Sequence, residues 1–242
     1  ILQSTTQLST LTEEAYGYLG RYITTSTFGR ILKLLRVVAL DGQHYFEELI
    51  RQGKVTLDDV LRFEYFEYKG PRIQSLSRLF DVSRVPPQGF DPPKFGTAYD
   101  ALVDQHFGRL IDGMIKAEPL VNTATLMDLN GYIPMHPTRV VQNWTGNREV
   151  DLVKNRCKKF YLGASLRGAR VGYLQAKLPE RVKDRSEFTR AGCDLQESEK
   201  ARQEFLVQTY SRDTGEVVVL LTVPCYVMGQ RWGCASATWK AE

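Results

Sequence analysis

An arginine and a histidine in the second half of the chain have side chains that could recognise a small molecule. Tyr132 and His136 are expected on one side of a predicted strand, because side chains alternate between the two faces of a strand. Arg156 precedes Phe160 by four residues in a predicted helix, so the two should share a helical face. A guanidinium offers paired donors, and aromatic rings add contact area. The pattern indicates a pocket that suits a carboxylate or another anion.

Four more residues are candidates for this pocket, and three of them have a structural alternative. Trp144 lies in a predicted loop beside the sheet. Asp151 lies near the face that carries Arg156; alternatively, these two residues form an ion pair that clamps the helix to the sheet. Tyr210 and Trp232, on neighbouring predicted strands, either form the floor of the pocket or fill the core. The predicted ligand-binding residues are Tyr132, His136, Trp144, Asp151, Arg156, Tyr210 and Trp232.

No catalytic residue or metal site is predicted. The sequence has no hydrolase elbow, phosphate-binding loop or HExxH motif, and 212–215 is better explained as a hairpin turn. The four cysteines form no CxxC pair, and the three histidines stand far from them in the sequence. Cys225 and Cys234 are expected to be buried, inert thiols. No cofactor is predicted, although a haem or another chromophore bound through His136 stays open.

The composition is that of a globular protein with a local excess of positive charge. The chain has 242 residues, of which 43% are hydrophobic and 25% charged, and its net charge is +4. The segment 139–190 carries 13 Lys or Arg against five Asp or Glu. Such a run is a solvated face, or else a surface that binds an acidic partner, anionic lipid or nucleic acid. No run of about 18 apolar residues is present, as a membrane span would require.

The first half of the chain is predicted to be helical. Apolar residues recur at three- and four-residue steps from Phe28 to Leu49, with a possible kink at Asp41-Gly42. This stripe is either an output or dimer element or part of the core. A second helix is expected to begin after Thr56, and a third spans about 97–118. The proline-rich segment 86–93 is expected to be a connector.

The second half is predicted to contain five strands and a helical crossover. Strands are expected at 120–127, 132–136, 205–211, 217–227 and 232–239, a helix at 149–161, and an irregular to helical, charged stretch at 163–202. The tight hairpins make the last three strands antiparallel, and a five-stranded antiparallel sheet with helices on one face is one α+β arrangement that fits the order β-β-α-β-β-β. The fold class is therefore α+β, with a helical lead-in and connector over 1–95 and a sheet domain over 96–242.

Several short motifs in this second half resemble the sensor domains of one group of bacterial methyl-accepting chemotaxis receptors. The motifs are DLNGYIPMH (128–136), TGNREVD (145–151), NRCKKF (155–160), LVQTYSRDTG (206–215), and VPCYVMG (223–229) followed by WG (232–233). Such domains have a PAS-like or Cache-like sheet. The resemblance implies the same fold for 96–242, with Trp144 in a loop that folds over the sheet.

The resemblance implies a sensing function without catalysis. The chain would bind a small, possibly anionic, molecule and relay its occupancy through helices to a signalling domain of the same polypeptide, as a homodimer joined by its N-terminal helices. Because the chain opens on Ile1 without a signal peptide, we expect a module of a longer protein. A place on the cytoplasmic side of a membrane receptor, or in a soluble receptor, is favoured over a periplasmic one, and no nucleic acid is expected. The alternative function is an interaction domain that uses 139–190 without a small ligand.

Overall fold

The computed structural model describes residues 26–170, 204–211 and 216–241. The predicted turn at 212–215 and most of the charged stretch 163–202 lie outside these ranges. The elements in chain order are α2 (Thr27–Arg51), α3 (Leu57–Leu61), β1 (Phe66–Glu67), a 3₁₀ helix (Gly70–Arg78), β2 (Phe95–Gly96), α4 (Asp100–Ala117), β3 (Val121–Asp128), β4 (Tyr132–Ile133), a 3₁₀ helix (Thr138–Val140), α5 (Arg148–Lys154), β5 (Lys159–Phe160), α6 (Ala164–Ala169), β6 (Leu206–Ser211), β7 (Val217–Val227) and β8 (Gln230–Lys240).

Helix α2 is continuous, so the expected kink at Asp41-Gly42 is wrong. The helix begins where the Ser26 hydroxyl oxygen accepts a hydrogen bond from the Gly29 amide at 3.1 Å. Gly42 does not break the helix but allows it to approach the sheet closely, because a Cβ there would lie 3.0 Å from Leu126 Cδ2. The apolar stripe of α2 is buried against β7 and β8 in the hydrophobic core. The stripe is therefore part of the core.

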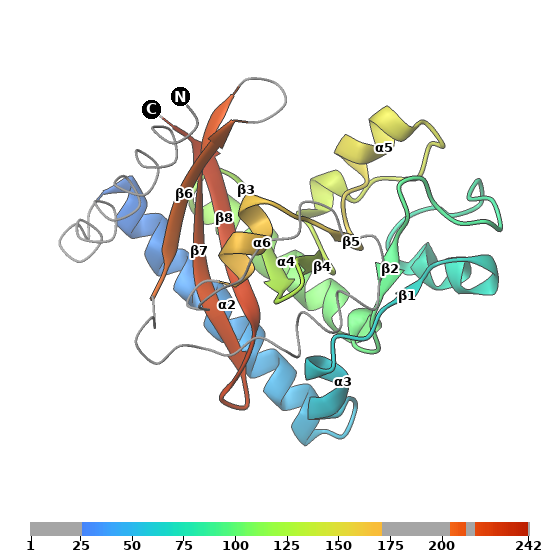
Figure 1. Cartoon of the computed structure of the whole chain (residues 1–242), viewed down its shortest axis with the longest axis horizontal. Helices are drawn as coiled ribbons and strands as arrows, with labels where there is room; N and C mark the ends of the chain where they lie inside the picture. Colours follow the sequence, from blue (N-terminus) through green and yellow to red (C-terminus); the bar gives the residue numbers. More distant parts are fainter. Residues whose placement is uncertain (1–25, 171–203, 212–215, 242) are drawn as a thin grey trace.

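The largest sheet has four antiparallel strands in the order β3-β8-β7-β6 (Figure 1). The last three strands are joined as the sequence predicts, with β7 and β8 forming a hairpin around Met228-Gly229. The expected fifth strand does not join this sheet. Strand β4 is only two residues long and pairs with β5, so that Tyr132 opposes Phe160 and Ile133 opposes Lys159. The α+β class is confirmed, with this correction to the sheet.

Helices lie on both faces of the sheet, so the prediction of helices on one face is wrong. Val223 and Ala39 together line a groove between β7 and α2, which places α2 on the face to which Val223 points. The adjacent Thr222 points to the opposite face and meets α6, where a Cβ on Gly168 would lie 2.5 Å from its Cγ2. Helix α4 packs against α2 through Phe46 and Phe107. In Figure 1, α2 and α6 lie on opposite sides of β7 and β8.

The helix predicted over 149–161 is wrong beyond its first half. Helix α5 ends at Lys154, and the apolar side chain of Val153 near its end is 63% exposed. The chain then turns: the Asn155 side chain donates to the Gln142 carbonyl, and Lys158 has a φ of +64°. Pairing of β5 with the distant β4 overrides the local apolar spacing. Arg156 is therefore on a loop rather than on a helix.

The remaining helical predictions are largely confirmed. Helix α3 begins with a capping box, in which the side chains of Thr56 and Asp59 each accept a hydrogen bond from the other's backbone amide. Helix α4 fills most of the predicted third helix, and the segment 86–93 contains neither helix nor strand. Among the described residues, no helix has the length and hydropathy that a membrane span needs.

Candidate functional site

Lys158 is buried and held by two aspartates of α4. Its Nζ lies 3.0 Å from an Asp100 oxygen and 2.5 Å from an Asp104 oxygen. The network continues to Arg78, which is 2.6 Å from Asp104, and to the Tyr132 hydroxyl, which donates to Asp100 at 2.6 Å. Burial alone would lower the pKa of Lys158, but Asp100 and Asp104 raise it above its ordinary value. Through Lys158, the residue directly before β5, this network ties β5 to α4. Tyr132, a predicted site residue, is one of its members and so has a structural role.

Two other buried lysines have no such partner. Lys94 donates from Nζ to the carbonyls of Asn155 at 3.2 Å and Cys157 at 2.8 Å, and Lys159 Nζ lies 3.4 Å from the Asp151 carbonyl. Within the described residues, no carboxylate oxygen lies within 4 Å of either amine. Burial lowers the pKa of Lys94 to about 8, and burial together with Lys94 lowers that of Lys159 to about 7.

His136 is buried beside these lysines, and neither of its ring nitrogens has a hydrogen-bond partner among the residues that the structure describes. Its ring centroid lies 5.2 Å from that of Tyr161, and the Arg156 guanidinium carbon lies 5.6 Å from the Tyr161 centroid. Burial, followed by the charges of Arg156, Lys94 and Lys159, holds the pKa of His136 well below its usual range. The imidazole is therefore neutral. We call Lys94, His136, Arg156, Lys159 and Tyr161 the cationic cluster.

Two more buried polar atoms near the cluster have no hydrogen-bond partner within the described part of the chain. They are the indole nitrogen Nε1 of Trp144 and the side-chain oxygen Oδ1 of Asn155. The Trp144 ring packs at 5.0 Å on Phe90, whose ring lies 5.7 Å from the Lys94 amine. Buried polar atoms without partners are rare in proteins. Their concentration next to unneutralised lysines marks this region as the candidate binding site.

The structure brings together only part of the predicted site. His136 and Arg156 lie in the cationic cluster, with Trp144 close by, but Asp151 serves the loop before α5. Its carboxylate accepts hydrogen bonds from the Thr145 amide at 3.0 Å, the Thr145 hydroxyl at 2.9 Å and the Gly146 amide at 2.9 Å. The alternative of an ion pair between Asp151 and Arg156 is wrong, because no oxygen of Asp151 lies within 4 Å of that guanidinium.

Tyr210 and Trp232 lie elsewhere. Trp232 is fully buried on the α2 side of the sheet, with its ring 5.1 Å from Phe46 and 6.3 Å from Phe107. Trp232 therefore fills the core and does not form the floor of a pocket, which were the two alternatives for this residue. Tyr210 is half-buried on the edge strand β6, opposite Val218.

The sequence analysis missed Lys94, Lys159 and Tyr161. Lys94 is far from the others in the sequence and follows the proline-rich connector, so no local spacing links them. The one available signal is Lys158-Lys159 between Cys157 and Phe160, two charges in an otherwise apolar strand. That pattern does not say which of the two lysines is neutralised.

The motif Asp128-Leu129-Asn130-Gly131-Tyr132 builds a turn. One Asp128 oxygen accepts the amides of Asn130 at 2.8 Å and Tyr132 at 3.0 Å, and the other accepts the Tyr65 hydroxyl at 2.5 Å. Gly131 has a φ of +79°, and a Cβ there would lie 2.4 Å from the Tyr161 carbonyl oxygen. The turn thus fixes the chain between β3 and β4 next to the cationic cluster.

We expect Asp128→Asn to flatten the dependence of stability on pH. Burial raises the pKa of Asp128 to about 7, so the folded chain keeps a proton that the unfolded chain releases near pH 4. Native stability therefore falls as pH rises from about 4 to about 7, by up to roughly 4 kcal/mol from this carboxyl alone. Asparagine cannot ionise and removes this loss. Urea unfolding of both proteins at pH 5 and pH 8 measures the effect; an equal change in the two proteins would contradict it.

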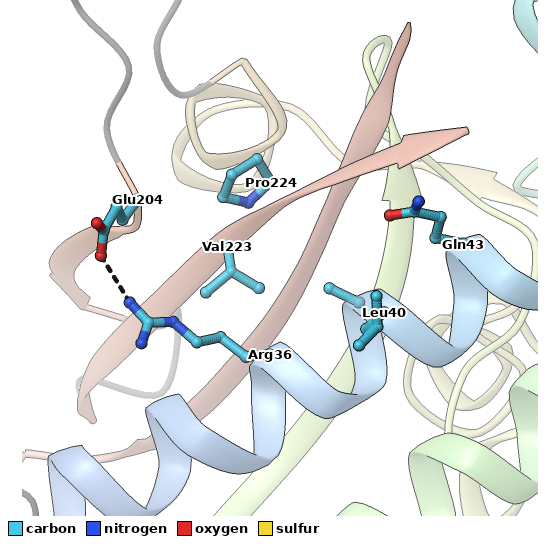
Figure 2. Close-up of a pocket in the computed structure, with 7 residues that line it drawn as sticks. Arg36, Leu40, Gln43, Glu204, Val223 and Pro224 are labelled. Carbon is cyan, nitrogen blue, oxygen red and sulfur yellow. Dashed lines mark hydrogen bonds and ion pairs between the residues drawn. The ribbon is translucent and has the colours of Figure 1, made fainter. Parts of the chain in front are cut away.

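A separate groove lies between α2 and β7 (Figure 2). It has a volume of about 480 Å³, and an ion pair at 2.8 Å between Arg36 and Glu204 stands at its side. The Leu40 side chain in its wall is 51% exposed. The lining residues are Arg36, Ala39, Leu40, Gln43, Glu204, Val223 and Pro224. None of them belongs to the predicted site.

In the described part of the chain, the cysteines are buried and the possible metal-ligating side chains form no cluster. Cys225 and Cys234 are buried free thiols, as predicted, and burial raises the pKa of each to about 12. In the ranges 26–170, 204–211 and 216–241, no three side chains of His, Cys, Asp or Glu gather as metal ligands.

Comparison with known proteins gave no match to a family model, a curated protein or a solved structure.

Proposed function

We propose that this chain is the ligand-sensing module of a chemoreceptor-type signalling protein and that it binds a small molecule without catalysis. The element order supports a PAS-like or Cache-like domain: β3 and β4, a helical crossover, then β6, β7 and β8 in an antiparallel sheet. The chain departs from that pattern where β4 leaves the main sheet for β5. We propose that this departure forms the binding site, because β5 carries Lys159.

The observation that carries the proposal is the unpartnered imidazole of His136. A neutral imidazole has one donor and one acceptor, and burying both without partners is costly. Here the ring is also surrounded by the unneutralised charges of Lys94, Arg156 and Lys159. A bound molecule with acceptor oxygens would accept hydrogen bonds from the donor nitrogen of the ring and from these cations together, which explains why so many donors converge.

A chain of contacts is available to relay occupancy from the cluster to the long helix α2. Lys159 in the cluster is adjacent to Lys158, which holds α4 through Asp100 and Asp104. Helix α4 meets α2 at His106. Its Nε2 lies 2.5 Å from an Asp41 oxygen, and its ring stacks on the Tyr45 ring with the centroids 3.8 Å apart. A ligand that moves β5 would thereby bias the packing of α4 on α2.

The proposal extends to partners and location. A homodimer would use the outer side of α2, where Val37 and Leu40 are exposed, since the apolar stripe itself is buried. The signalling domain would belong to the same polypeptide, on the cytoplasmic side of a membrane receptor or in a soluble receptor. An interaction domain built on 139–190 is less well supported. Lys158, Lys159 and Arg170 are buried, and 171–190 lies outside the described residues.

A ligand panel tests the proposal. The chain is heated with organic acids, amino acids, purines, sulfate and neutral amides, and each compound that raises the melting temperature is titrated by calorimetry. An absorbance scan of the purified chain reports any bound chromophore. We expect at least one compound to stabilise the chain saturably with one site per chain. If no compound does so, and binding to anionic vesicles or nucleic acid appears instead, the sensing function is wrong and the interaction function replaces it.

A further inference from the structure

The charges of the cationic cluster are not balanced by the described protein. Lys94 and Lys159 are buried, Arg156 is half-buried, and none has a carboxylate within 4 Å among the described residues. A buried ammonium must either lose its proton or meet a negative charge. The neighbouring Lys158 receives two aspartates for this purpose. Of two consecutive lysines, Lys158 is thus neutralised by aspartates of the protein, whereas Lys159 has no counter-ion within 4 Å among the described residues.

The donors of the cluster outnumber the acceptors that the protein supplies. Lys94 uses two of its three N–H groups on carbonyls, and Lys159 has one long contact at 3.4 Å. Arg156 lies over the Tyr161 ring, and neutral His136 adds one further donor. A monoanion would leave at least one cation unpaired. Two negatively charged groups match the cluster better.

We propose that the cationic cluster binds a small dianion, and that Lys159 takes up one proton from solvent as the dianion binds. This inference rests on the proposed sensing function and names its ligand class. The two groups are carboxylates or the oxygens of a sulfate-like or phosphoryl-like ion, because all of these accept hydrogen bonds from ammonium and guanidinium groups.

The proton uptake follows from what surrounds Lys159. The groups that face it are Lys94, Arg156 and His136, the Cys157 thiol, and Asp151, whose carboxylate is engaged by its own loop. Burial and Lys94 favour the neutral amine, with a pKa of about 7. A bound dianion reverses this balance because it attracts the charged form. Above pH 7 the free amine is therefore mostly neutral and the bound amine is charged.

Calorimetry on the full chain tests whether binding requires two negative charges on the ligand. Sulfate and succinate are compared at pH 7 with acetate, and succinate with its neutral diamide. We expect each dianion that fits to bind at least roughly tenfold more tightly than acetate, and the diamide not to bind. Preference for sulfate indicates a compact oxyanion site, and preference for succinate a dicarboxylate site. Acetate binding as tightly as both dianions would overturn the inference.

A pH series with sulfate, whose charge is constant between pH 6 and pH 8, tests the proton. One linked proton with the cited pKa weakens binding by about tenfold between these limits. Calorimetry at pH 8 in buffers of different ionisation enthalpy should show uptake of at least about one proton, because Lys94, with a pKa of about 8, adds to the uptake by Lys159, and uptake near zero at pH 6. If the better dianion is succinate, the same series is run with it from pH 6.5. Affinity that does not change with pH, without proton uptake, would overturn the inference.

Matched variants locate the effect. Lys159→Met should remove most of the pH dependence of dianion affinity. Arg156→Gln should weaken binding at every pH but leave the pH dependence in place. Lys154→Met, an exposed lysine of the same stretch, should change neither. Circular dichroism confirms that each variant is folded. If no dianion binds but a neutral compound of the panel stabilises the chain, this inference fails and the sensing function stands; if nothing binds, both fail.

Discussion

Gly233→Ala is expected to abolish the native fold. Gly233 lies in β8 opposite Asp128 of β3, where a Cβ would stand 1.9 Å from the Met127 carbonyl oxygen and 2.6 Å from the Asp128 Cα. Both atoms belong to the backbone, so no side-chain rotation relieves the clash and the strands must separate. Separation would also displace the Asp128 turn. The cost should approach the whole stability of an ordinary domain, about 5–15 kcal/mol.

The measurement is thermal unfolding followed by circular dichroism, together with the yield of soluble chain. Gly113→Ala is the matched control, because Gly113 is inside α4 with nothing within 4 Å of its Cβ position. Alanine there should be neutral or stabilise the chain by up to about 1 kcal/mol. A Gly233→Ala protein that unfolds cooperatively near the wild-type temperature would show that β3 and β8 do not pair as described.

Lys158→Met is expected to destabilise the chain by about 3–5 kcal/mol, because it leaves buried carboxylates without their shared cation. Asp104 keeps Arg78, but Asp100 keeps only uncharged donors such as Tyr132. Urea unfolding at pH 7.5 measures the loss, and Lys154→Met is the exposed control. A loss of less than about 1 kcal/mol would contradict the buried network.

The same variant should be less impaired in acid. Burial raises the pKa of Asp104, and the charge of Lys158 opposes that rise, so without Lys158 this carboxyl holds its proton still more tightly in the folded chain than in the unfolded chain. Stability of the variant therefore decreases as pH rises through the ordinary carboxyl range, and its deficit should shrink between pH 7.5 and pH 4.5. A deficit that stays constant over this interval would mean that lost packing, rather than charge, explains the effect.

The sequence predicted the elements whose signals are local. Periodicity and turn residues predict the long strands β3, β7 and β8 and the helices α2 and α4, and the N-cap residue Thr56 predicts the start of α3. The predicted helix over 149–161 is wrong in its second half because a non-local contact decides the structure there. Its apolar spacing suits a helix, but β5 pairs with β4, which is more than 20 residues away. Such non-local pairing leaves no period in the sequence.

The candidate binding site was predictable only in part, because its members come from separate segments. His136 and Arg156 were selected for their chemistry and do lie together, although the helix invoked to place Arg156 ends before it. Trp232 and Tyr132 were equally plausible by residue type, yet one fills the core and the other holds Asp100. Lys158 has aspartate oxygens within 4 Å of its amine and Lys94 and Lys159 do not, a difference that exists only in three dimensions.

The most direct test of ligand binding at the cationic cluster is to observe the His136 ring itself. The chain has three histidines, of which His44 is exposed and His106 contacts Asp41, so ¹⁵N-histidine labelling gives three pairs of ring-nitrogen signals, two of which are internal controls. His136→Gln assigns the third. A compound that stabilises the chain should shift the His136 ring nitrogens more than those of His44, in proportion to occupancy. Stabilisation that leaves the His136 ring unchanged would place the ligand elsewhere and contradict the account.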